Sequence, residues 1–327
     1  MRFSTCGLLL ILIAGCSAQP GPVFEPVEDA EAPRWPLPPE AKRVTWMGEY
    51  RAARGRRERL SGGYVRPHGV GLGAEGELCV ADPGARVVWV HAEDRAVRFV
   101  GQGVLRSPID CAFLPGARLA VADSAARVVV AFDTRGRVVW RSAAGELARP
   151  VGLAVDTAGG RLLVADAKAH GLVEMDFEGR VTGRLGGRGE EPGSFNFPTA
   201  VAIGRDGSIL VLDSLNFRVQ VLTGAGQPRF AFGVAGDGPG TFLRPRGIGV
   251  DSKGRIYVAD ALFDNVQIFD HQGRLLLALG QRGRQPGEFS MPAGVAVHPA
   301  GRLYVADAYN RRVQVFRLLD EDGEEAL

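Results

Sequence analysis

A five-residue segment ending in aspartate recurs six times along the chain, and this repeat limits the possible folds more than any other feature. Each copy runs from Leu or Ile through Val and Ala or Leu to Asp. The copies are Leu78–Asp82, Leu119–Asp123, Leu162–Asp166, Ile209–Asp213, Ile256–Asp260 and Leu303–Asp307. The aspartates are 41 to 47 residues apart, and a proline precedes each segment. Repetition at this period is typical of β-propellers, in which each repeat forms one blade.

Each repeat holds enough strand signals for a four-stranded blade. A first strand follows the proline, as in Gly247–Val250, and the aspartate segment forms the second. The third and fourth are clearest at Arg218–Leu222 and Gly273–Gly280, and glycine turns separate them. One such sheet cannot bury both faces alone, whereas six arranged radially can. We therefore expect an all-β, six-bladed β-propeller of four-stranded antiparallel blades.

The sixth repeat lacks a fourth strand, and the start of the body can supply it. The repeat ends after its third strand at Phe316, and residues 318–327 form an acidic tail. The segment Arg43–Gly48 ends in glycine, like the fourth strands of other repeats. We predict that it completes the sixth blade, so that residues 43–317 form a propeller closed by its N-terminal strand.

Residues 1–16 have the features of an export signal. A charged Arg2 precedes the apolar run Leu8–Ile13, which is too short to span a bilayer. The segment Ile13–Cys16 resembles the bacterial lipobox, which implies a signal peptide cut before a lipidated Cys16; an ordinary signal peptide is the alternative. In that pattern Ser17 implies the outer membrane as the location in the cell envelope. Residues 17–42 contain seven prolines and are predicted to be an extended tether between the lipid anchor and the propeller.

The later repeats resemble NHL repeats. Gly240–Pro245 and Gly287–Pro292 match the start of that family's pattern, and Ala306–Phe316 matches its end. The loops after Asp82 and Asp123 read as one residue shorter and lack the family's Asn. The combination of tether and propeller also resembles bacterial six-bladed propeller lipoproteins.

The repeated aspartates are predicted to be structural. Six equivalent copies are best explained if each accepts hydrogen bonds from loop backbone at the end of its strand. The formal net charge is only +2, which argues against nucleic acid as a partner. No cofactor and no oligomer beyond a monomer is expected.

Departures from the repeat are better candidates for a site. The residue after each proline is expected near the channel mouth, where His68 and Arg246 stand out among Ile109, Val151, Thr199 and Ala293. Asp110 replaces a glycine or alanine found at this position in the other repeats. We predict a ligand site formed by His68, Asp110 and Arg246; the alternative is three unrelated exposed side chains.

Two enzymes of related fold imply a metal-dependent alternative. The amidating lyase that contains NHL repeats carries Pro-His at three channel positions, but only Pro67–His68 matches here, and zinc needs three or four ligands. Tyr309 stands where the resemblance would put a catalytic tyrosine, although this tyrosine is also common in the repeat. Calcium-dependent lactonases use a Glu, two Asn and an Asp at the axis. Asn216, Asn265 and Asn310 are the candidates for the two asparagine ligands. We expect all three in loops after the aspartate segments, where the NHL pattern already has an asparagine.

Cys79 and Cys111 fall in inner strands at positions that are apolar in other repeats. Packed thiols are therefore predicted, with a disulfide as the alternative that export would permit. Taken together, these features favour a non-enzymatic binding or scaffold module that presents its channel-end loops to a protein, peptide or glycan. A metal-dependent hydrolase or lyase, lactonase-like or amidating-lyase-like, is the alternative, and no catalytic or metal-binding residue is assigned.

Overall fold

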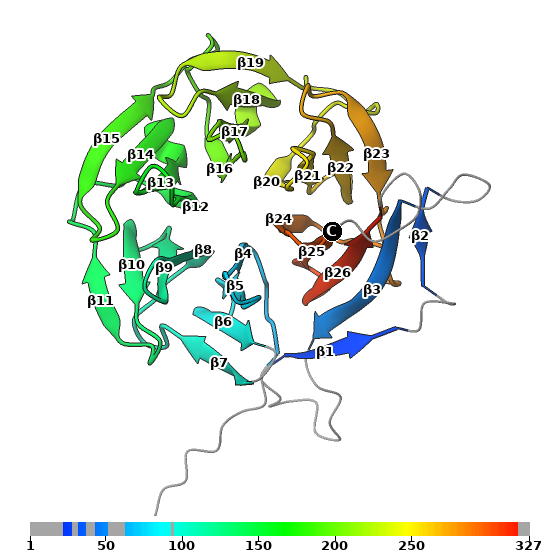
Figure 1. The fold of residues 1–327 in the computed structure, drawn as a ribbon, viewed down its shortest axis with the longest axis horizontal. Coiled ribbons are helices and arrows are strands. Elements are labelled where there is room, and N and C mark those ends of the chain that lie inside the picture. Colours follow the sequence, from blue (N-terminus) through cyan, green and yellow to red (C-terminus); the bar gives the residue numbers. More distant parts are fainter. Residues whose placement is uncertain (1–21, 28–31, 37–42, 52–62, 93–94, 320–327) are drawn as a thin grey trace, which may run out of the picture.

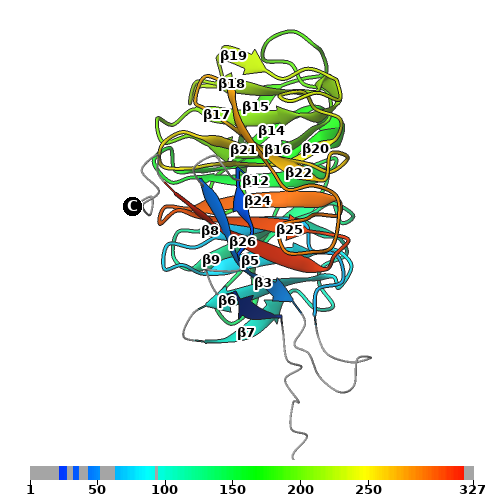
Figure 2. The same ribbon diagram turned by 90° about the vertical axis from the view of Figure 1, so that its right-hand side faces the viewer.

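Six antiparallel sheets surround a common axis in the computed structural model, which describes residues 22–27, 32–36, 43–51, 63–92 and 95–319. Figure 1 shows the ring along the axis, and Figure 2 shows it edge-on. The predicted six-bladed propeller is confirmed. The signal peptide, Cys16 and the tail from residue 320 lie outside the described residues and stay predictions. Within the described ranges, no helix is long and apolar enough to cross a membrane.

Each blade has four strands that run outward from the axis in chain order. The innermost strands are β4 (Val70–Leu72), β8 (Pro108–Leu114), β12 (Pro150–Asp156), β16 (Pro198–Ile203), β20 (Pro245–Val250) and β24 (Pro292–His298). The second strands are β5 (Leu78–Asp82), β9 (Arg118–Asp123), β13 (Arg161–Asp166), β17 (Ile209–Asp213), β21 (Ile256–Asp260) and β25 (Arg302–Asp307).

The outer half of each blade follows the loop after the repeated aspartate. The third strands are β6 (Val87–Ala92), β10 (Val128–Phe132), β14 (Gly171–Met175), β18 (Arg218–Leu222), β22 (Asn265–Phe269) and β26 (Arg312–Leu318). The outermost strands are β7 (Arg95–Val100), β11 (Val138–Arg141), β15 (Val181–Gly186), β19 (Pro228–Phe232), β23 (Leu275–Leu279) and β3 (Val44–Arg51).

The hydrophobic core lies between the blades. The second strand of every blade is buried over at least five consecutive residues, whereas β15 at the outer edge alternates between half-buried and exposed residues. Each buried cluster combines side chains from two neighbouring blades, such as Cys79 and Val90 of blade one with Val121 and Phe132 of blade two. Each blade therefore buries its apolar area against its neighbours, and closing the ring leaves no blade face uncovered.

The loops after the repeated aspartates all have the same length, so the predicted shortening after Asp82 and Asp123 is wrong. In every blade the fourth residue after the aspartate has a positive φ, between 52° and 59°. These six residues are Arg86, Arg127, His170, Phe217, Asp264 and Arg311. The blades differ in the composition of this loop and not in its backbone.

One predicted loop residue lies in a strand. Asn265 begins β22 and pairs with Asp260, as Arg218 pairs with Asp213. Phe263 therefore stands where blades four and six have Asn216 and Asn310. The expected loop position of Asn265 is therefore wrong, because it is the fifth residue after its aspartate, whereas Asn216 and Asn310 are the third.

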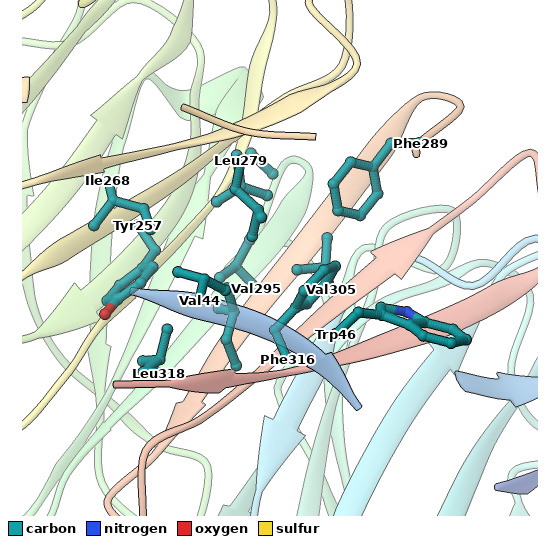
Figure 3. Packing of buried hydrophobic residues seen from close by; sticks show 13 residues of the cluster. Val44, Trp46, Tyr257, Ile268, Leu279, Phe289, Val295, Val305, Phe316 and Leu318 are labelled. Carbon is teal, nitrogen blue, oxygen red and sulfur yellow. The ribbon is translucent and has the colours of Figure 1, made fainter. Parts of the chain in front are cut away.

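The ring closes through β3, as predicted. β3 pairs with β26 from Tyr50↔Val313 to Val44↔Leu318. Figure 3 shows Val44 and Trp46 of β3 packed with Phe316 of blade six and with Tyr257 of blade five. The first strand of the body thus completes the sixth blade and seals its contact with the fifth.

Buried ion pairs reinforce this closure. Arg312 on β26 bonds Glu49 on β3 at 2.6 Å, and the same guanidinium bonds Asp307 at 2.8 Å. Glu49 also pairs with Arg51 at 2.7 Å, and Arg51 pairs with Glu25 at 2.8 Å. Both Arg312 and Glu49 are about 95 % buried, with side-chain exposures of 6 % and 5 %.

Part of the proline-rich segment packs on the propeller, which differs from the expected tether. β1 (Val23–Pro26) and β2 (Arg34–Trp35) both pair with the outer edge of β3. The Trp35 ring meets Phe316 edge-on, with centroids 5.7 Å apart. The edge of β3 offers unpaired backbone groups, and the aromatic residues between the prolines bury apolar area there.

The propeller also extends past the predicted boundary at residue 317. Leu318 and Leu319 are 2 % and 5 % exposed, and the Leu319 N–H donates to the Arg43 carbonyl at 2.8 Å. Two residues assigned to the acidic tail therefore belong to the sixth blade.

Candidate functional site

The central channel contains a cavity of about 70 Å³ lined by the first strands of all six blades. His68, Asp110 and Arg246, the predicted site residues, all line it. They come from blades one, two and five, which explains why they meet only at the axis. Within the described residues, no hydrogen bond or ion pair joins these three side chains directly.

Asp110 connects neighbouring blades. Its Oδ1 accepts a hydrogen bond from its neighbour, the Cys111 N–H, at 2.9 Å, and its Oδ2 accepts one from the Leu153 N–H of blade three at 2.8 Å. Burial raises the pKa of Asp110 to about 7, although both N–H groups favour the carboxylate. Because its two oxygens already bond backbone, Asp110 acts mainly as a link between blades two and three.

His68 is neutral at physiological pH. Its Nδ1–H donates to the Ile109 carbonyl at 3.1 Å, which leaves Nε2 as the acceptor. Burial, and next the charge of Arg246, lower the pKa of His68 to about 4. Among the described residues, no group of three or more His, Cys, Asp or Glu side chains is placed to hold a metal ion.

The repeated aspartates have the arrangement predicted for a structural role. All six are at most 1 % exposed, and each accepts a backbone N–H from the loop that precedes its own blade. Asp82, for example, accepts from Val65 at 2.7 Å and from Arg66 at 3.0 Å. Their oxygens are therefore used to hold loops at the channel mouth.

The two asparagine side chains in these loops are also structural. Asn216 donates to the Gly189 carbonyl at 2.9 Å and to Asp213 at 2.8 Å. Asn310 makes the equivalent bonds to Gly283 and Asp307, at 2.8 and 2.9 Å. Neither one is a free metal ligand of the lactonase type.

Cys79 and Cys111 are free thiols, as predicted. They pack in one apolar cluster between blades one and two, where both are at most 2 % exposed. Burial raises the pKa of the Cys111 thiol, so it is unreactive in this environment.

Sequence reasoning missed an exposed apolar rim at the channel mouth. The second residue after the repeated aspartate is Leu215, Leu262 or Tyr309 in blades four to six, with exposures of 53 %, 53 % and 62 %. In blades one to three the same position holds Gly84, Ala125 and Lys168. A position-by-position alignment of the loops would have revealed this difference.

The rim stands on a fixed backbone. The Leu215 N–H donates to the Asn196 carbonyl at 3.0 Å, and the Tyr309 N–H donates to the Ser290 carbonyl at 3.1 Å. In blade five the neighbouring Ala261 N–H bonds the Arg244 carbonyl at 3.0 Å. Each rim loop is therefore tied to the interblade loop beside it.

Arginines surround the same mouth. Arg66 and Arg244 precede the prolines of blades one and five, and Arg246 follows the second of these prolines. Within the described part of the chain, their guanidinium groups have no hydrogen bond or ion pair. Burial, and next repulsion from Arg244, lower the pKa of Arg246, against a smaller opposing effect of Tyr309. The mouth is thus positively charged.

Comparisons with known proteins agree with this architecture. The family model described as NHL repeat matches residues 195–222 and 289–316. A search of curated proteins by sequence gives no match.

Solved structures share the fold at low identity. A Bacteroides thetaiotaomicron protein of unknown function is 16 % identical with a TM-score of 0.64, over 82 % of this chain and 73 % of that one. A streptogramin B lyase is 11 % identical with a TM-score of 0.59, over 79 % and 95 %. A virginiamycin B lyase from Staphylococcus aureus is 12 % identical with a TM-score of 0.57, over 78 % and 95 %. On the strength of its matched repeats and its ring of blades, the chain is a six-bladed β-propeller that contains NHL repeats.

Proposed function

We propose that this protein is a non-enzymatic binding or scaffold propeller whose channel-mouth loops receive a protein, peptide or glycan in the cell envelope. The observation that carries this proposal is the rim of Leu215, Leu262 and Tyr309, which exposes large apolar side chains on loops fixed by hydrogen bonds. Exposed apolar groups next to arginine are typical of recognition surfaces. A rigid frame that carries variable loops suits such a role.

The chemistry around the channel supports binding over catalysis. The carboxylate oxygens of Asp110 and of the repeated aspartates accept backbone hydrogen bonds, and His68 bonds the Ile109 carbonyl. The carboxylate oxygens are thus engaged with backbone, and His68 keeps only Nε2 available toward the cavity. The cavity of about 70 Å³ is also far smaller than the pockets that usually enclose a drug-sized substrate, roughly 300–1,000 Å³.

Capture from envelope extracts tests the proposal. A triple variant, Leu215→Ser, Leu262→Ser and Tyr309→Ser, should lose the bound envelope component. A matched control, Val139→Ser with Leu276→Ser, removes exposed apolar residues of 49 % and 42 % from the outer strands and should retain it. Equal capture by both variants would count against the mouth as the binding face.

The alternative is a metal-dependent hydrolase or lyase with its site in the channel. The likeness to two lyases favours considering it, although at 11 % and 12 % identity that likeness concerns the fold. Elemental analysis of the purified protein separates the two proposals. Stoichiometric calcium or zinc would overturn the binding proposal in its simple form.

We also propose that Cys16 is lipidated and holds the propeller at the outer membrane. The lipobox-like segment Ile13–Cys16 and the following Ser17 support this location. Mass spectrometry of the mature N-terminus, compared with a Cys16→Ser variant, is the test. An unmodified N-terminus that begins elsewhere would contradict it.

A further inference from the structure

The arginines at the channel mouth come from the two blades on either side of blade six. Arg246 and Arg244 belong to blade five, and Arg66 belongs to blade one, so blade six lies between the two sets in the ring (Figure 1). Arg246 lines the channel cavity, and the charges of Arg244 and Arg66, together with Tyr309 of blade six, act on its pKa. Residues that are far apart in the sequence therefore form one positively charged patch.

Among the described residues, no ion pair neutralises this patch: Asp110 lines the same cavity as Arg246 but bonds the Cys111 and Leu153 N–H groups. The repeated aspartates Asp82 and Asp260 are fully buried and accept the backbone N–H groups of Arg66 and Arg244. Their oxygens therefore fix the backbone under the arginines while the guanidinium groups stay unpaired. Arg246 is partly buried, whereas Arg66 and Arg244 are exposed, so their repulsion bears mainly on the Arg246 charge, and an anion would relieve it.

The size of the cavity limits what can enter. A water molecule needs roughly 10–15 Å³ of space measured in this way, so about 70 Å³ admits a group of only a few heavy atoms. His68 is neutral and adds no further positive charge inside. A compact anionic group fits the cavity, and the remainder of a ligand has to lie outside, on the rim.

Building on the proposed function, we infer that the mouth binds the oxyanion group of its ligand, a carboxylate or a phosphate. The guanidinium of Arg246 holds the oxyanion, with Arg244 and Arg66 as additional donors. Arginine presents a planar fork of N–H donors that matches both kinds of oxyanion. Tyr309 and Leu262, exposed beside this patch, contact the apolar part of the ligand.

Calorimetric titration of the full chain with inorganic phosphate and with succinate tests this inference, with sodium chloride at equal ionic strength as the reference. We expect saturable binding of at least one oxyanion, weakened at least about tenfold in Arg246→Gln, since a charged hydrogen bond is lost. Arg135→Gln, which removes an exposed arginine from the turn between β10 and β11, should bind like the wild type. Unchanged melting temperatures would establish that both variants fold.

The outcomes distinguish a phosphate from a carboxylate ligand, and they distinguish a failure of the oxyanion site from a failure of the proposed binding function. Binding of phosphate alone or of succinate alone identifies which oxyanion the mouth prefers. Binding of neither, or equal loss in both arginine variants, overturns the inference. If capture from envelope extracts still depends on the rim in that case, the proposed function stands without it. If an oxyanion binds but capture does not depend on the rim, the proposed function falls and the oxyanion site remains.

Discussion

Blades one to three and blades four to six share a backbone but differ in how they hold their interblade loops. The third strands of blades four to six carry a buried glutamine: Gln220, Gln267 and Gln314. Each bonds both an N–H and a carbonyl of the preceding interblade loop, as Gln267 does with Gly240 and Thr241 at 2.8 Å each. In blades one to three the same position is Trp89, Val130 or Val173, which packs in apolar cores.

This difference falls in the same three blades as the rim. The interblade loops before blades four, five and six share one extra pairing, Arg188↔Phe195, Ala235↔Phe242 and Arg282↔Phe289. The glutamines hold these loops, and the loops in turn hold Leu215, Leu262 and Tyr309 at the mouth. The comparison teaches that the buried glutamines of the repeat support the interblade loops beside an exposed surface to which they do not themselves contribute.

The largest expected effect comes from the buried ion pairs that close blade six. Arg312→Met removes the buried cation that Glu49 and Asp307 share, which leaves Glu49 with Arg51 and Asp307 with neutral donors only. It should lower the free energy of unfolding by about 3–5 kcal/mol. In blade four, Arg218 pairs only with Asp213, so Arg218→Met should cost about 1–2 kcal/mol. Urea unfolding measures the free energy of unfolding of both variants. Equal losses of stability would show that the ion pair with Glu49 across the closure adds nothing to the Arg312–Asp307 pair.

The next largest effect is a pH dependence of stability caused by His91, a buried histidine that departs from the repeat in blade one. His91 stands where the other blades have Phe132, Met175, Leu222, Phe269 and Phe316, and it bonds the Tyr64 hydroxyl at 2.7 Å. Burial lowers the pKa of His91 to about 4 from 6.5. The unfolded chain therefore takes up a proton first on acidification, and stability is lost as the pH falls from about 6.5 to about 4.

Tyr64→Phe with His91→Leu restores the apolar pair of the other blades. Its stability should fall less steeply than that of the wild type over this window, by about 1.4 kcal/mol per pH unit. Tyr64→Phe alone keeps the histidine and should keep the slope. The pKa of Asp110 is raised from 3.8 to about 7, so this group adds stability as the pH falls through that range. It does so in all three proteins, and the quantity to measure is therefore the difference in slope between each variant and the wild type. Identical slopes in all three would contradict a neutral buried His91.

A third prediction exchanges the buried residue of the third strand between blades four to six, which have glutamine, and blades one to three, which have an apolar residue. Gln267→Met leaves the Gly240 N–H and the Thr241 carbonyl unpaired and should cost about 1–3 kcal/mol. The converse change, Val173→Gln, buries an amide in an apolar cluster and should cost a similar amount. Denaturant midpoints measured at constant m-value check both. A neutral Gln267→Met would remove the glutamines from the account of the rim.

The smallest effect is expected at the rim itself. Leu262→Ser changes an exposed side chain and should alter the free energy of unfolding by less than about 0.5 kcal/mol. Thermal unfolding measures this change. A loss above about 1 kcal/mol would mean that Leu262 has a packing role, which would weaken its assignment to ligand contact.

The fold can be predicted from the sequence because the same strand and turn signals occur in all six repeats. Six copies of one pattern, with apolar runs and glycine turns, leave only one arrangement that buries every blade. Closure by Arg43–Gly48 followed from the missing strand of the sixth repeat, and the strand in the structure runs from Val44 to Arg51. The packing of Trp35 did not follow, because the proline content of its segment hides two short pairings with β3.

The candidate site was only partly predictable. His68, Asp110 and Arg246 were selected as departures from the repeat, and they do line one cavity. Their partners could not be read from the sequence, because the Asp110–Leu153 bond depends on the spacing of neighbouring blades at the axis. The rim was missed because its residues lie inside the consensus loop, where each looks ordinary without its spatial neighbours.

The central claim is that the mouth of blades four to six is the binding face, and site-specific photocrosslinking in envelope membranes tests it most directly. A crosslinking residue at position 262 is compared with one at the equivalent exposed position of blade two, Ala125. We predict a discrete adduct from position 262 that weakens in Arg246→Gln, and none from position 125. The same adduct from both positions, or an adduct from position 125 alone, would contradict the account.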